Sequence, residues 1–142
     1  MKKIFVASSV YLVLGLAAGV FYREFTKLSG FVEGEKTQLS ILHTHLLTLG
    51  FLVMLVVLIL EKLFDLAADW RFNGFFWLYN SGLVVTTAMM TLRGMNTVKS
   101  VEVTEGLSAA IAGIAGLGHI AIALGLGLLM IVLGTKIFKP QH

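Results

Sequence analysis

The sequence predicts an all-α polytopic membrane protein, a bundle of four transmembrane helices in a single domain that covers residues 1–142. Apolar residues make up 57% of the chain and charged residues 13%, and the mean hydropathy is +0.89, well above that of soluble domains. Four apolar segments are each long enough to cross about 30 Å of hydrocarbon as a helix. The single proline, Pro140, follows the last segment, so no segment is interrupted by proline.

The four segments are joined by short connections, which favour one compact bundle. The first, residues 4–22, follows two lysines like a signal peptide, but its longer apolar stretch favours a retained helix. The others are residues 39–60, 75–92 and 107–133. Consecutive spans cross in opposite directions, so the second and fourth helices run parallel to each other.

Charge and cysteine content exclude several functions. The net charge of +3 comes without a basic run, which argues against nucleic acid, and the absence of cysteine excludes disulfides and thiolate metal ligands. Lys and Arg near the helix ends divide six against five in favour of cytoplasmic N- and C-termini, and we expect a bacterial inner membrane. Trp70, Trp77 and Tyr79 would then form part of an inner aromatic belt.

Three intramembrane histidines are the candidate functional residues, because ionisable groups in hydrocarbon are costly. His43 and His45 lie 18 and 16 residues before Glu61, and His119 lies 17 before Lys136, at the same predicted membrane face. At about 1.5 Å per residue, the three imidazoles lie within roughly 3 Å of one another in depth. Imidazole is a common metal ligand, and two of them on facing helices can hold a haem iron from both sides.

Small residues beside His119 provide room for a flat ring. Gly116, Ala115 and Ala112 precede it by three, four and seven residues, so its helix face is nearly bare backbone. A porphyrin could lie against this face. Met54 is the best-placed methionine as an alternative ligand, although methionines in a bundle are more often core residues.

The second helix offers two alternative ligands, because residues two apart point about 200° apart. His43 shares a helical face with Ser40, Leu47, Gly50 and Met54, whereas His45 shares one with larger apolar residues. This favours His43 as the ligand. If His45 is the ligand instead, His43 supports it from behind.

Two arginines are candidates for binding the haem propionates, since a guanidinium matches a carboxylate in geometry. Arg23 closes the first helix and Arg93 closes the third, both on the side of the histidines. Taken alone, each is better explained as an arginine snorkelling at a helix end than as a ligand-binding residue.

The segment His43-Thr44-His45-Leu46-Leu47-Thr48-Leu49-Gly50 resembles the His-Thr-Asn…Gly segment of haem–copper oxidase catalytic subunits, especially the C-type and nitric oxide reductase branch. In that family the His ligates a low-spin haem b and the Gly gives the ring room, which the resemblance implies for His43 and Gly50. His45 stands in place of the usual Asn. Gly118-His119 is loosely similar to the family's second ligand. The resemblance implies haem b without copper chemistry, and a homotrimer by analogy with the three four-helix arcs of the oxidase.

The whole chain also looks like a family of small four-helix bacterial membrane proteins of unknown function. The expected function is haem b binding, with two histidine ligands for electron transfer, for example with quinol or another redox partner, or with one ligand for redox or gas sensing. The alternatives are a cofactor-free bundle whose histidines hydrogen-bond to Thr44, Thr48 or Thr86, and a small transporter of protons or a transition-metal ion. No constellation typical of an enzyme is present.

Small residues spaced four apart on the first and fourth helices, such as Gly15 and Gly19, permit close association in lipid. We therefore expect a homo-oligomer.

Overall fold

A computed structural model describes residues 1–32 and 35–138, and within these ranges it contains helices and no strand. The long helices are α1 (Lys2–Leu28), α4 (Trp70–Val98) and α5 (Glu105–Ile137). The second span combines α2 (Leu39–His45), the π-helix η1 (Leu46–Leu52) and α3 (Val53–Phe64), and a 3₁₀ turn, η2 (Leu66–Ala68), follows it. The four spans have mean hydropathies of 2.2, 2.4, 1.2 and 2.3, and each is long enough to cross a membrane. The predicted fold class is confirmed.

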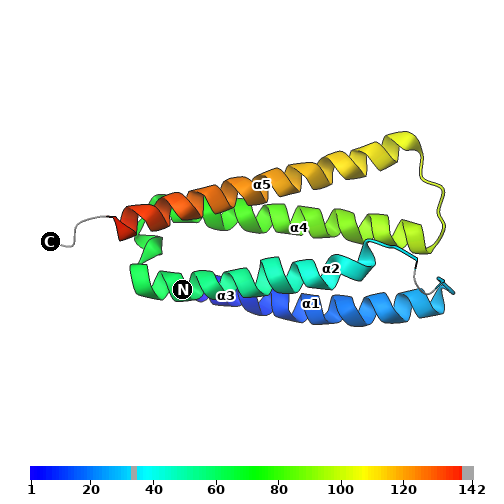
Figure 1. Ribbon diagram of the computed structural model, residues 1–142, viewed down its shortest axis with the longest axis horizontal. Helices are drawn as coiled ribbons and strands as arrows, with labels where there is room; N and C mark the ends of the chain where they lie inside the picture. Colours follow the sequence, from blue (N-terminus) through cyan, green and yellow to red (C-terminus); the bar gives the residue numbers. More distant parts are fainter. Residues whose placement is uncertain (33–34, 139–142) are drawn as a thin grey trace.

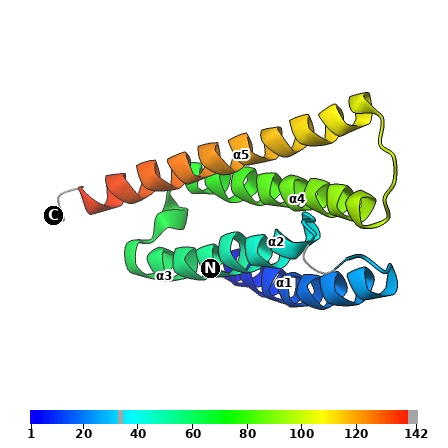
Figure 2. The ribbon, with the colours of Figure 1, turned by 45° about the vertical axis from the view of Figure 1, so that its right-hand side comes forward.

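The helices form two antiparallel pairs (Figure 1). α1 packs along α2, η1 and α3, while α4 packs along α5, and both views show this pairing (Figure 2). The second pair meets the first mainly through α4, which contacts α2 and η1. The N-terminal amine lies 4.0 Å from the Glu61 carboxylate, at the bundle end where α5 also finishes.

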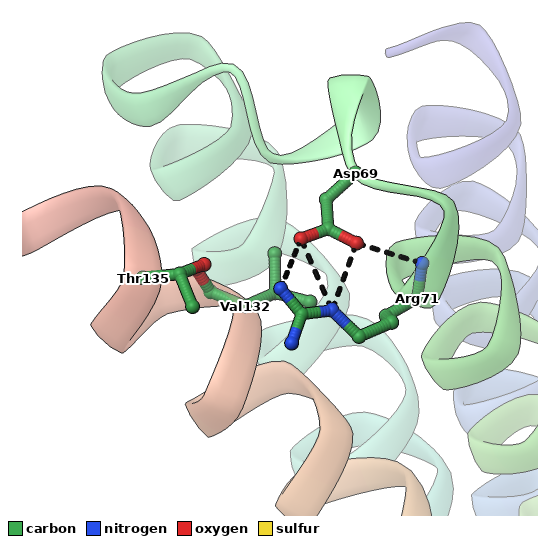
Figure 3. Close-up of polar contacts among 4 residues, drawn as sticks. All are labelled: Asp69, Arg71, Val132 and Thr135. Carbon is green, nitrogen blue, oxygen red and sulfur yellow. Dashed lines mark hydrogen bonds and ion pairs between the residues drawn. The ribbon is translucent and has the colours of Figure 1, made fainter. Parts of the chain in front are cut away.

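α4 begins five residues before the predicted apolar span, because its start is set by a polar cap (Figure 3). The Asp69 carboxylate accepts a hydrogen bond from the backbone N–H of Arg71 at 2.9 Å. The Arg71 guanidinium also donates to both Asp69 oxygens, at 3.0 and 2.6 Å. These hydrogen bonds from Arg71 lower the pKa of Asp69 to about 2.

The core is centred on α4. Phe72, Phe75 and Tyr79 are buried, with successive ring centroids 5.5 and 5.7 Å apart. The predicted aromatic belt is therefore wrong for Tyr79, whose side chain points into the bundle. Trp70 and Trp77 do lie on the surface, with 81% and 68% of their areas exposed.

Large apolar side chains cover the outside of the bundle. Val13 on α1 and Leu117 on α5 are both 66% exposed. A contiguous apolar exterior of this kind suits contact with lipid chains.

Candidate functional site

A pocket of about 410 Å³ lies between α2, α4 and α5, and two of the three predicted histidines line it. His45 comes from α2 and His119 from α5, while Arg93 comes from the polar end of α4. The complete lining is Gln38, Ile41, His45, Met89, Met90, Arg93, Ile111, Ala112, Ala115, Gly116 and His119. The pocket thus brings together imidazoles from two parallel helices and one guanidinium.

Both pocket histidines have the same hydrogen bond to their own helix. His45 Nδ1 lies 3.0 Å from the carbonyl oxygen of Ile41, and His119 Nδ1 lies 2.8 Å from that of Ala115. A carbonyl oxygen only accepts, so Nδ1 carries the proton in each ring and donates it. In the neutral form of such a ring Nε2 is the nitrogen without a proton, and this is the nitrogen that can bind a metal.

The position of His119 follows from a close contact between α4 and α5 one residue before it. A Cβ placed on Gly82 would lie 2.6 Å from the carbonyl oxygen of Gly118. A Cβ on Gly118 would overlap the Thr86 hydroxyl. Glycine is therefore required where the two backbones meet, and the next residue, His119, lines the pocket beside this contact.

The bare surface predicted beside His119 forms one wall of the pocket. Ala112, Ala115 and Gly116 line it, and a Cβ on Gly116 would meet nothing within 4 Å. A flat ligand could therefore approach the α5 backbone closely at this wall.

His43, the ligand preferred from the sequence, does not line this pocket. His43 lies on the α1 side of α2, where its Cβ is 3.9 Å from the position that a Cβ on Gly19 would take. Its Nδ1 is buried without a hydrogen-bond partner among the described residues, and its Nε2 lies 3.4 Å from the Thr44 hydroxyl. A helical wheel separates the two faces of α2, but it does not show which face has a neighbour against it.

Gly50 and Arg23 lie away from this pocket. The Tyr11 ring fills the space beside Gly50, so this glycine serves the packing of α1 against η1. Arg23 lines a different hollow near the end of α1, and its Nε lies 3.8 Å from the Glu24 carboxylate. Of the two predicted arginines, the pocket includes Arg93 alone.

Met89 and Met90 line the pocket and were missed from the sequence. They precede Arg93 by four and three residues, so they lie on the same side of α4 as Arg93. This spacing is the feature of the sequence that could have identified them. Met54, the methionine favoured from the sequence, is fully buried elsewhere in the core.

Among residues 1–32 and 35–138, no group of three or more His, Cys, Asp or Glu side chains is placed to hold a metal ion. Residues 1–136 match the family model described as a protein of unknown function (DUF2871). Searches of curated proteins and of solved structures found no match. With nearly its whole length covered by that family model, the chain belongs to the DUF2871 family.

Proposed function

We propose that the protein binds haem b in the pocket between α2, α4 and α5, with His45 and His119 as the axial ligands. One observation carries the proposal: both imidazoles line one pocket and both donate Nδ1–H to their own helix, which leaves Nε2 available. Metal-bound histidines commonly have this arrangement, in which the second nitrogen is fixed by a backbone carbonyl.

The donor set favours haem over a bare metal ion. A zinc site normally has four ligands, or three and a water, whereas haem iron needs at most two from the protein. The described residues offer two imidazoles in the pocket and no group of three His, Cys, Asp or Glu side chains such as a zinc site would need. The apolar lining from Ile41, Ile111 and the two methionines suits the faces of a porphyrin.

Arg93 would bind the propionates at the polar edge. It lines the haem pocket and also two neighbouring hollows, which contain polar residues such as Asn96 and Ser40. Its guanidinium therefore lies between an apolar chamber and the polar end of the bundle. A guanidinium in this position can bind a carboxylate through two hydrogen bonds.

The cofactor-free alternative has less support at the two pocket histidines. It depends on cross-helix hydrogen bonds to threonines, yet His45 and His119 each bond to their own helix. The buried Thr86 hydroxyl has no hydrogen-bond partner among the described residues. Among the histidines that the structure describes, His43 alone has a hydrogen-bond contact with a threonine, its own neighbour Thr44.

Two histidine ligands give six-coordinate iron, which favours single-electron transfer over the binding of gases. We therefore assign the protein to membrane electron transfer, with a quinol or a redox protein as the partner class. The resemblance of residues 43–50 to the haem–copper oxidase segment is part of the reasoning for haem b. We give the ligand role to His45 instead of His43, because His45 lines the pocket.

Location and assembly belong to the same proposal. The N-terminus and the end of α5 lie at one end of the bundle, which suits the proposed orientation with cytoplasmic termini in a bacterial inner membrane. A homo-oligomer, a trimer by analogy with the oxidase, is supported by the open sides of Gly113, Gly127 and Gly134 on α5.

The test is an optical spectrum of detergent-purified protein, oxidised and then reduced, after expression with ample haem. We expect a sharp reduced α band in the wild type, lost or converted to a high-spin spectrum in His45→Ala and His119→Ala. His43→Ala is the matched control and keeps the low-spin spectrum. Colourless wild-type protein, or loss of the band in His43→Ala alone, would contradict the proposal.

A further inference from the structure

The π-helix η1 begins directly after His45, where a regular helix would continue as α. A π-helical turn contains one more residue than an α-helical turn. It therefore rotates the preceding segment, which includes His45, by about 100° relative to the segment that follows, since this is the angle of one α-helical residue. The direction in which His45 points thus depends on η1.

Hydroxyl groups from two other helices bond to the backbone of η1. Ser8 of α1 donates to the carbonyl oxygen of Phe51 at 3.1 Å, and Tyr79 of α4 donates to that of Leu49 at 2.8 Å. Ser8 is 2% exposed and Tyr79 is fully buried, so neither bond competes with solvent. A buried carbonyl displaced from the α-helical ladder needs such a donor.

These two hydrogen bonds differ from those of other hydroxyls on long helices. Thr26, Thr87 and Thr91 each donate to a carbonyl four residues earlier on their own helix. Among the described hydroxyls of α1 and α4, Ser8 and Tyr79 bond across to another helix, and both bond to η1. The Tyr11 ring packs against Gly50 in the same turn, so η1 is held from α1 and from α4.

We propose that Ser8 and Tyr79 are positioning residues for His45. By stabilising η1 they keep His45 turned towards His119, and without them the turn relaxes towards regular α-helix and rotates His45 out of the pocket. This inference rests on the proposed haem site for its purpose, but the predicted rotation concerns the protein without cofactor.

The first test needs no haem. The chain has no cysteine, so His45→Cys provides a single thiol whose labelling by a water-soluble maleimide reports access through the open pocket. We expect the labelling of haem-free His45→Cys protein to slow several-fold when either Tyr79→Phe or Ser8→Ala is added. Thr87→Val is the matched control, since it removes a buried hydroxyl that bonds within its own helix, and it leaves the rate unchanged.

The second test uses the haem-loaded protein with His45 intact. Tyr79→Phe, which keeps the buried ring, and Ser8→Ala should each convert part of the low-spin spectrum to high-spin, with recovery on adding imidazole. Unchanged labelling and unchanged spin state in both single variants would overturn the inference. Wild-type protein that binds no haem would instead overturn the proposed function, and the labelling result would still decide whether the two hydroxyls orient residue 45.

Discussion

Replacing Gly118 by alanine tests how closely α5 must approach α4 beside His119. The new Cβ would overlap the Thr86 hydroxyl and lie 2.9 Å from the carbonyl oxygen of Gly82. Because the Gly82 carbonyl belongs to helix backbone, the two helices must separate to admit the methyl group. Overpacking of this kind costs about 1–3 kcal/mol of folding free energy.

The alanine also gains about 1 kcal/mol of helix propensity, so the contact cost is obtained from a matched pair of variants. Gly113→Ala is the control, since it lies on the same helix and its Cβ would meet nothing within 4 Å. The assay is thermal unfolding of haem-free protein in detergent, followed by circular dichroism. We expect Gly118→Ala to melt roughly 2–12 °C below Gly113→Ala, given about 1–3 kcal/mol of contact cost and about 2–4 °C per kcal/mol for a chain near this size.

A double variant separates the contact from other effects of the alanine. Thr86→Ala removes the overlapping hydroxyl, which has no hydrogen-bond partner among the described residues, so it should recover part of the lost stability of Gly118→Ala. Equal melting temperatures for Gly118→Ala and Gly113→Ala would refute the close α4–α5 contact. The reasoning that places His119 beside that contact would fail with it.

Three further predictions concern the pocket and the α4 cap. Gly116→Leu should abolish haem binding while the protein still folds, because its side chain enters the pocket and meets no packed neighbour; an unchanged reduced spectrum would contradict this. Arg93→Gln should raise the haem dissociation constant about tenfold or more, the loss of a charged hydrogen bond worth about 1.5–3 kcal/mol, whereas Arg23→Gln leaves it unchanged in the same titration. Arg71 lowers the folded-state pKa of Asp69 to about 2. The Asp69–Arg71 interaction therefore stabilises the fold above the unfolded pKa of about 4, and this stabilisation is lost as the pH falls towards 2. Asp69→Asn should therefore make the melting temperature fall less when the pH is lowered from about 4 to about 2. The same fall in melting temperature in the variant and the wild type would contradict this prediction.

The four spans follow from hydropathy, because uninterrupted apolar runs of this length have few alternatives to a membrane helix. Their ends depend on local chemistry that hydropathy does not detect, as the early start of α4 at Asp69 shows. The burial of Tyr79 could not be predicted from its position near two tryptophans in the sequence. It depends on whether a residue faces lipid or another helix, and Tyr79 faces η1.

The prediction that His45 and His119 lie at one level came from counting along parallel helices, which assumes a constant rise per residue. The π-helix η1 departs from that assumption between His45 and Glu61, but both histidines still line one pocket. The choice between His43 and His45 needed information that one helix does not contain. Which of the two histidines lines the pocket depends on the side of α2 that faces α4 and α5. It also depends on the π-helix η1, whereas a helical wheel assumes a regular α-helix. Propensity does not predict a π-helix, because its stabilisation comes from tertiary contacts such as those of Ser8 and Tyr79.

The glycines of α5 explain why a pocket exists at this level. Gly118 and Gly125 contact α4 closely, with a Cβ on Gly125 placed 3.0 Å from Tyr79, whereas Gly106, Gly113 and Gly116 have open sides. α5 packs closely against α4 at Gly118 and Gly125. It diverges from α4 towards its N-terminus, as both views show (Figures 1 and 2). His119 comes directly after Gly118, which is the one of these two contacts nearer the N-terminus of α5, and it lines the pocket between α5 and α2. The pocket thus depends on two faces of α5: one packs closely on α4 at Gly118 and Gly125, and the other presents bare backbone at Ala115 and Gly116. Substitutions on the two faces should therefore affect stability and haem binding separately.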